Sequence, residues 1–190
     1  MGKVYDSIDE SLKEFIQRQR MFFVATAPLA GDGLVNLSPK GLDSLRVMDE
    51  HTVAYADLTG SGIETVAHIK ENGRIVVMFC SFEGAPKIVR LHGRGEVIEP
   101  SHDEFEELRN VFPDYPGLRC FIRVRCERVS DSCGWSVPLY EFKAQRSQLV
   151  AWAESKGIDE VSQYQREVND RSLDGLPGLT SWGEKGHSNP

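Results

Sequence analysis

The feature that most constrains this fold is a series of short, strand-like segments separated by glycine- and proline-containing turns. The two strongest segments, residues 74–82 and 87–98, are joined by an EGAP turn at residues 83–86. Residues 121–130 alternate cleanly between apolar and charged or polar side chains, which is typical of a half-buried strand. Short strands at this spacing predict a closed barrel rather than a doubly wound parallel sheet.

Other segments complete a mainly β domain with peripheral helices. Strand-like composition predicts further strands over residues 21–27, 34–38, 45–47 and 52–56. Helical spacing and capping patterns predict helices over residues 6–20, 64–71, 101–111, 147–155 and 158–168. Asp6 or Ser7 is expected to cap the first helix, and Gly73 to close the second. We therefore expect an α+β chain with a six- to seven-stranded β-barrel in residues 1–150. Residues 151–190 are expected to form a helical C-terminal extension and a Gly/Pro/Ser-rich tail.

Composition and charge argue against several classes of protein. The chain has 190 residues and a formal net charge of −7, with its lysines and arginines scattered rather than clustered, unlike most nucleic-acid-binding proteins. No apolar run approaches the length of a membrane span, and the N-terminal segment lacks the apolar core of a signal peptide. The four cysteines have no CxxC spacing, which favours reduced thiols. We expect a cytoplasmic protein that binds neither nucleic acid nor membranes.

Residues 36–65 contain the chemical groups that a phosphate monoester needs. Lys40 stands at the end of a strand-like segment, and a TGSG turn at residues 59–62 stands at the start of a helix. Hydroxyls, backbone N–H groups freed by glycine, a helix N-terminus and a lysine together suit an anion. Each part also has a plainer interpretation, with Lys40 as an exposed turn residue and Ser61 as the N-cap of a capping box completed by Glu64. Both interpretations can hold, because a helix N-cap is also an anion site.

Several motifs follow the order and spacing of a known family. They are Lys40-Gly41 at a strand end, Tyr55 in the strand before the turn at 59–65, ENGRI at 71–75, VRLHG at 89–93 and CGWSVP at 133–138. Together these blocks resemble the pyridoxamine 5′-phosphate oxidase superfamily, the FMN-binding split barrel, over roughly residues 10–150. Their shared order is more specific than any single motif.

The resemblance implies a homodimer with FMN bound at the subunit interface and a small-molecule substrate. Residues 35–40 would lie along the ribityl chain and the flavin edge, with Lys40 near the phosphate or the flavin. The candidate cofactor-binding residues are Asn36, Ser38, Lys40, Tyr55, Asp57, Thr59, Ser61, Gly62, Thr65, Arg90 and Trp135. Plainer roles stay open for three of them: Asp57 as a turn cap, Arg90 as a surface arginine and Trp135 as a core or interface aromatic.

The chain also departs from the vitamin B6 oxidases of that superfamily. Those enzymes have an Arg-Lys pair where this chain has Ser61-Gly62, a glutamine at Ile88 and an arginine at Ser136. We therefore expect an FMN flavoprotein and oxidoreductase of unknown substrate, not a vitamin B6 oxidase, and assign no catalytic residue. Two alternatives stay open: the same barrel binding F420 or haem, or a flavin-binding regulatory module without turnover. The histidines and cysteines lack metal-ligand spacing, so no metal site is expected.

Overall fold

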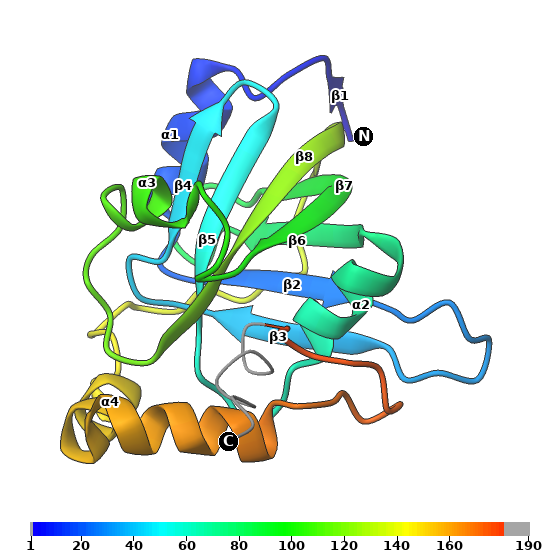
Figure 1. Cartoon of the computed structure of the whole chain (residues 1–190). Helices are drawn as coiled ribbons and strands as arrows, with labels where there is room; N and C mark the ends of the chain where they lie inside the picture. The colour runs from blue at the N-terminus through cyan, green and yellow to red at the C-terminus, as the bar shows by residue number, and fades with distance from the viewer. Residues whose placement is uncertain (1, 181–190) are drawn as a thin grey trace, which may run out of the picture.

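The computed structural model, which describes residues 2–180, contains one eight-stranded antiparallel sheet that curls into a barrel-like shape (Figure 1). Seven strands follow the spatial order β3-β2-β6-β7-β8-β5-β4, and β1 pairs with β8. The strands are β1 (Val4–Tyr5), β2 (Phe22–Thr26), β3 (Asn36–Lys40), β4 (Leu45–Asp49), β5 (Thr52–Leu58), β6 (Arg74–Cys80), β7 (Ile88–Ile98) and β8 (Leu118–Ser132). The helices are α1 (Glu10–Arg18), α2 (Glu64–Asn72), α3 (Phe105–Arg109) and α4 (Gln148–Val168). The expected mainly β fold with peripheral helices and a C-terminal helical extension is confirmed.

Differences from the expected elements are local. The sheet gains β1, whose two residues are too few to show a periodic pattern. The N-cap of α1 is Asp9, which accepts a hydrogen bond from the Leu12 N–H at 2.8 Å, so the prediction of Asp6 or Ser7 was wrong. The Ile8 N–H is bonded to the Glu50 carbonyl, and this contact holds the chain before Asp9 outside the helix.

The two helices near the middle of the chain differ in how well the sequence predicts them. Helix α2 ends as expected, because Gly73 adopts a φ of 71° that suits glycine at this position. The helix expected over residues 101–111 is reduced to α3. Its first part forms tight turns instead, in which the N–H groups of His102 and Phe105 bond to carbonyls three residues earlier.

The core has two parts, one on each side of the sheet's central strands. The main cluster packs α1 and α2 against the sheet and includes Leu12, Tyr55 and Val66, all fully buried. The smaller cluster lies under α3, where the rings of Phe105 and Phe112 both lie 5.2 Å from the ring of Phe121. These clusters fix β5 and β8, the two strands that carry most of the charged residues of the site described below.

The C-terminal extension packs against one end of the barrel (Figure 1). Helix α4 is interrupted at Gly157, whose φ of 74° and ψ of 167° are not helical, and this confirms the break expected between residues 155 and 158. After α4 the chain turns back toward α2, and Leu179 joins the main core. None of the helices in the described range is long and apolar enough to cross a membrane.

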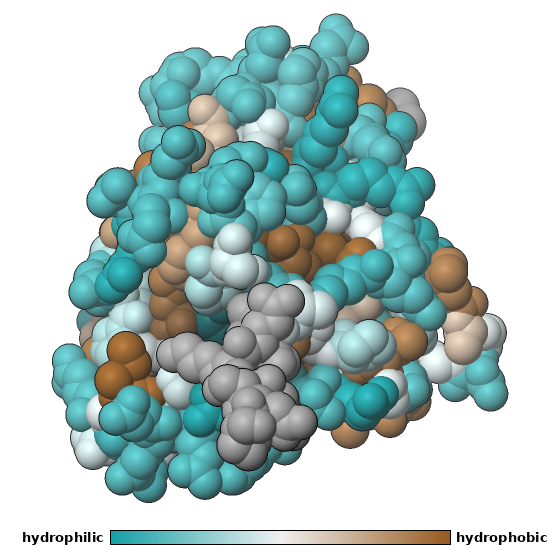
Figure 2. Space-filling model, viewed as in Figure 1, coloured by the Kyte–Doolittle hydropathy of each residue, from teal (hydrophilic) through white to brown (hydrophobic). Residues whose placement is uncertain are grey.

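The visible surface is mostly hydrophilic, with hydrophobic residues in separate patches (Figure 2). One patch lies at the hairpin between β2 and β3, where Leu34, Val35 and Leu37 are all exposed. Among the cysteines, Cys80, Cys120 and Cys126 are buried free thiols, and Cys133 is exposed.

Candidate functional site

A cleft of about 1930 Å³ opens beside β3. Its walls come from β3, the turn between β5 and α2, the turn between β6 and β7, the segment 140–149 and residues 171–173. Eight lysines and arginines line it but only three glutamates, although the whole protein has a net charge of −7. The cleft therefore concentrates positive charge within an acidic protein, as expected of a site for an anionic ligand.

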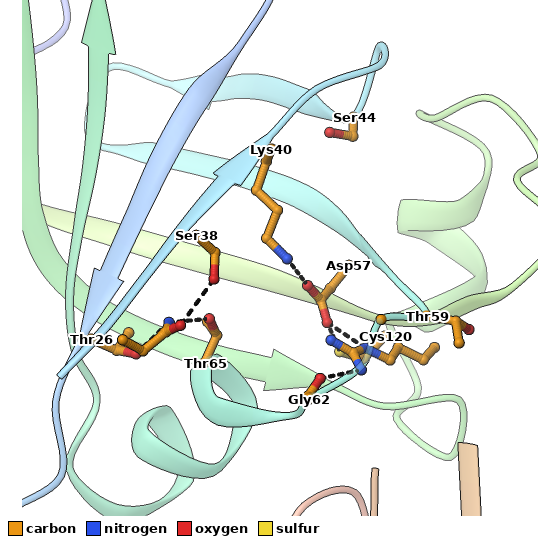
Figure 3. A network of polar contacts seen from close by, with 12 residues as sticks. Thr26, Ser38, Lys40, Ser44, Asp57, Thr59, Gly62, Thr65 and Cys120 are labelled. Carbon is orange, nitrogen blue, oxygen red and sulfur yellow. Dashed lines mark hydrogen bonds and ion pairs between the residues drawn. The ribbon is translucent and has the colours of Figure 1, made fainter. Parts of the chain in front are cut away.

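Three charged side chains meet at the wall of this cleft, and Figure 3 shows the Lys40 ammonium pointing at the Asp57 carboxylate. The Lys40 Nζ lies 2.7 Å from Asp57 Oδ1, and the Arg119 Nε lies 2.7 Å from Asp57 Oδ2. Asp57 is fully buried. Both cations line the cleft, where the Lys40 side chain is 20% exposed and that of Arg119 only 5%. One carboxylate is thus shared by two cations, which leaves the cluster with a net charge of about +1.

The charge state of Asp57 follows from its two partners. Burial opposes ionisation and would raise the pKa of Asp57, but the charges of Arg119 and Lys40 and their hydrogen bonds outweigh it. The pKa of Asp57 falls from 3.8 to about 2. The carboxylate therefore stays ionised at neutral pH, and it stabilises both cations beside the cleft.

Both cations keep donors for a ligand. Arg119 uses Nε for Asp57, and both hydrogens of Nη1 for the Gly62 carbonyl and the Asn169 Oδ1, each at 2.8 Å. Within the described residues its Nη2 has no hydrogen-bond partner, and Lys40 uses one of its three N–H groups. A guanidinium and an ammonium that are both anchored to Asp57 and keep unpaired N–H donors suit a phosphate or a carboxylate.

A second polar network continues from this cluster along β3 (Figure 3). The Asn36 Nδ2 donates to the hydroxyls of Thr65 at 3.0 Å and Thr26 at 3.2 Å, and the Ser38 hydroxyl donates to Asn36 Oδ1 at 2.9 Å. The Thr26 hydroxyl in turn lies 3.0 Å from Nδ1 of the buried His68. Asn36, Ser38 and Thr65 line the cleft, so the structure brings these predicted residues together with Lys40.

The turn before α2 differs from its expected geometry. The N-cap position is Ile63, which provides no side-chain hydrogen bond, so the alternative interpretation of Ser61 and Glu64 as a capping box was wrong. The Glu64 carboxylate instead accepts from the Leu173 N–H at 3.1 Å. Ser61 is exposed at the cleft, and the first N–H groups of α2 lack a side-chain cap. Because Ile63 is fully buried and Glu64 places a carboxylate in the first turn, the exposed Ser61 hydroxyl is the donor that this turn offers to an anion.

Thr59 contributes to the shape of the site rather than donating to a ligand. Its hydroxyl donates its one hydrogen to the Gly117 carbonyl at 2.7 Å and accepts from the Gln165 Nε2 at 2.5 Å. Gly62 lines the cleft and holds Arg119 through its carbonyl. The hydroxyl donor expected at Thr59 is therefore occupied, and the open hydroxyl of the turn is that of Ser61.

Besides the fully buried Asp57, three predicted residues do not line the cleft of this chain. Tyr55 is fully buried in the main core, with its ring 5.5 Å from that of Phe22, and the neighbouring Ala56 lines the cleft instead. Arg90 donates to the Ser132 hydroxyl at 2.9 Å, and Trp135 is 83% exposed. Neither of these two lines the cleft, so their contact with a cofactor stays a prediction.

Sequence reasoning missed Arg119 and Asn169. Arg119 precedes residues 121–130, where strand β8 was expected, and it reaches Asp57 through the pairing of β5 with β8. A buried aspartate needs a cationic partner, so Asp57 itself indicated that one was near. Strand alternation could not single out Arg119, because Arg123 and Arg125 fall on the same face of the strand. Asn169 lies 50 residues further along the chain, and no local pattern connects it to Arg119.

Comparison with known proteins settles the family. A family model described as pyridoxamine 5′-phosphate oxidase matches residues 8–133. The pyridoxamine 5′-phosphate oxidase family protein ustO of Aspergillus flavus is 40% identical over 195 aligned positions, covering 93% of this chain and 78% of that protein. The chain belongs to the pyridoxamine 5′-phosphate oxidase family.

Solved structures support the split-barrel fold of this family member. HupZ from Group A Streptococcus is 23% identical and has a TM-score of 0.50, over 64% of this chain and 91% of that chain. A candidate pyridoxamine 5′-phosphate oxidase of Lactobacillus delbrueckii is 20% identical and has a TM-score of 0.53, over 67% of this chain and 98% of that chain. The expected split-barrel fold is confirmed.

The depressed pKa of Asp57 predicts acid sensitivity. Because the carboxylate is ionised in the folded state down to about pH 2, its contribution to stability is fully present above the unfolded pKa of 3.8. That contribution, on the order of 2 kcal/mol, is lost as the pH falls from about 4 to about 2. Urea unfolding of the wild type and Asp57→Asn at several pH values in this range measures the contribution. The free energy of unfolding should fall more steeply with decreasing pH in the wild type than in the variant.

If both proteins lose stability equally over this range, the ion cluster is not formed as described. A carbon-detected NMR titration of the Asp57 carboxyl gives the same pKa in the wild type alone, should Asp57→Asn not fold.

Proposed function

We propose that this protein is an FMN-binding flavoprotein whose FMN phosphate lies against Lys40 and Arg119. The observation that carries the proposal is the cluster around Asp57, in which two cations share one buried carboxylate and keep open donors at the cleft. The Ser61 hydroxyl, which is exposed at the cleft, adds a further donor. Hydrogen bonds to a charged group contribute about 1.5–3 kcal/mol each. This donor set fits a phosphate monoester without the Arg-Lys pair of the vitamin B6 oxidases.

The remainder of the cleft suits the flavin ring and a second molecule. Its volume of about 1930 Å³ exceeds the roughly 300–1,000 Å³ typical of small-ligand pockets. Apolar side chains line it beside the charged wall, among them Met21, Leu58 and Phe82. We propose that the cleft takes FMN and a small-molecule substrate together, as an oxidoreductase requires.

The division of work would be that of other cofactor enzymes. FMN, when bound, supplies the redox chemistry, while this chain binds and orients it and sets its electrostatic surroundings. No residue is assigned as a general acid or base. Family membership favours a flavin, and of the described residues that line the cleft none is a histidine or cysteine, two common ligands of haem iron. FMN is therefore preferred to haem, and F420 stays an open alternative.

We also propose that the protein is a homodimer with the cofactor at its interface. Strand β3 carries part of the site and lies at one edge of the sheet. Leu34, Val35 and Leu37 are 55%, 75% and 63% exposed there, and such apolar groups on a sheet edge favour burial against a partner.

Light scattering after size-exclusion chromatography should give twice the 21.3 kDa chain mass. A monomer, in the presence of FMN, would exclude this arrangement.

The test of FMN binding is a titration followed by flavin fluorescence and absorbance. The wild type should take up FMN and show flavin absorption bands. Ser61→Asp should weaken FMN binding about tenfold or more, because a second negative charge near the phosphate costs at least about 1.4 kcal/mol. Ser101→Asp adds the same charge at an exposed serine away from the cleft and should leave the affinity unchanged.

A wild-type protein that takes up no FMN contradicts the proposal, and a Soret band would favour haem instead. If Ser61→Asp binds FMN as tightly as the wild type, the phosphate binds in another part of the cleft. Bleaching of the bound flavin by NADH or NADPH separates an oxidoreductase from a passive flavin-binding module.

A further inference from the structure

The chain after α4 forms a fixed strap against the barrel. We call residues 169–180 the C-terminal strap. One end is held by Asn169, which is fully buried, and the other by Leu179, which belongs to the main core. The Lys70 ammonium donates to the Gly178 carbonyl at 2.8 Å, and the Thr180 N–H donates to the Glu99 carboxylate at 2.8 Å. In Figure 1 the strap runs from the end of α4 back toward α2.

The strap borders the cleft where the anion site lies. Arg171, Ser172 and Leu173 line the cleft, and the Leu173 N–H is held by the Glu64 carboxylate in the first turn of α2. The backbone is tightly folded here, because the Gly178 N–H bonds to the Asp170 carbonyl at 2.7 Å and a Cβ at Gly178 would overlap the Asn169 carbonyl oxygen. The strap is therefore a built wall of the site.

The amide of Asn169 joins two parts of the proposed phosphate site. Its Oδ1 accepts from the Arg119 Nη1 at 2.8 Å, and its Nδ2 donates to the Gly60 carbonyl at 3.0 Å. One turn earlier in α4, the buried Gln165 donates to the Thr59 hydroxyl. One amide thus fixes the guanidinium and the Gly-rich turn relative to one another.

The contacts of Arg119 define what Asn169 controls. Asp57 holds Nε, and the Gly62 carbonyl and Asn169 together occupy both hydrogens of Nη1. These three contacts leave Nη2 as the part of the guanidinium without a partner among the described residues. Without Asn169, Nη1 would have a free hydrogen and the guanidinium would lose one of its three restraints.

We propose that Asn169 is a positioning residue for the anionic group of the ligand, and that the strap completes the anion site. The identity of that group as the FMN phosphate rests on the proposed function; the coupling between Asn169 and anion binding does not. Asn169 would hold Arg119 so that Nη2 faces the anion. A residue that only stabilised the fold would affect every ligand of the cleft alike.

FMN and riboflavin separate these roles, because riboflavin has the same ring system and ribityl chain but no phosphate. In Asn169→Ala the dissociation constant for FMN should rise about tenfold, whereas that for riboflavin should be unchanged. Asn110→Ala is the matched control: Asn110 is likewise the C-cap residue of a helix, but it is exposed and its amide donates to the Glu106 carbonyl, not to a group of the anion site. It should bind both ligands as the wild type does.

If Asn169→Ala does not fold, Asn169→Asp replaces it. The carboxylate keeps an acceptor for Arg119 but loses the donor to the Gly60 carbonyl. It also reduces the net charge of the cluster from about +1 to about 0, so FMN binding should again weaken while riboflavin binding does not. Equal losses for FMN and riboflavin would reduce Asn169 to a structural role and overturn the inference. Unchanged FMN affinity in Asn169→Ala would also overturn it.

A wild type that binds neither flavin refutes the proposed function but not this inference. Inorganic phosphate is then the probe, measured by its effect on the thermal unfolding temperature. Stabilisation by phosphate in the wild type and Asn110→Ala, but not in Asn169→Ala, supports the positioning role. Equal stabilisation of all three proteins, or none in the wild type, rejects it.

Discussion

A single buried carboxylate, Asp57, organises the charged wall of the cleft. It comes from β5, whereas its partners Lys40 and Arg119 come from β3 and β8. Strand β3 is at one edge of the sheet order and β5 lies next to the other edge, so the contact between Lys40 and Asp57 joins strands that are not neighbours. The ion cluster therefore depends on the curling of the sheet, and the site exists only in the closed fold.

A cluster of this kind is not explained by stability alone. Burying a carboxylate costs several kcal/mol, and well-packed apolar residues often stabilise a core equally well. The arrangement does, however, hold two cations beside a cleft with donors still open. The whole protein has a net charge of −7 and so does not attract anions over long distances. The positive charge gathered at the cleft favours an anionic ligand at that site.

Local patterns in the sequence predicted much of the fold and part of the site. Strands β2 to β8, the end of α2 at Gly73 and the break in α4 each follow from turn chemistry or periodicity within a short segment. The local sequence indicates Lys40 as a site residue because it ends a strand just before a glycine. The position of Asn36 was likewise predicted, although its partners Thr26 and Thr65 were not paired with it in advance.

The remaining features depend on contacts between distant segments. Thr59 has a hydroxyl that could bind a phosphate. That hydroxyl instead donates to the Gly117 carbonyl and accepts from Gln165, which is 106 residues away. The role of Arg119 depends on its strand register beside Asp57. Asn169 reaches the site only because α4 packs across the end of the barrel. Such tertiary contacts leave no periodic trace in a single sequence.

A crystal structure of the protein with bound FMN tests the central claim most directly. We predict a phosphate oxygen within hydrogen-bond distance, about 3 Å, of the Arg119 Nη2 or the Lys40 Nζ, with Asp57 still bridging the two cations. A phosphate bound elsewhere, with Lys40 and Arg119 contacting no part of it, would contradict the account.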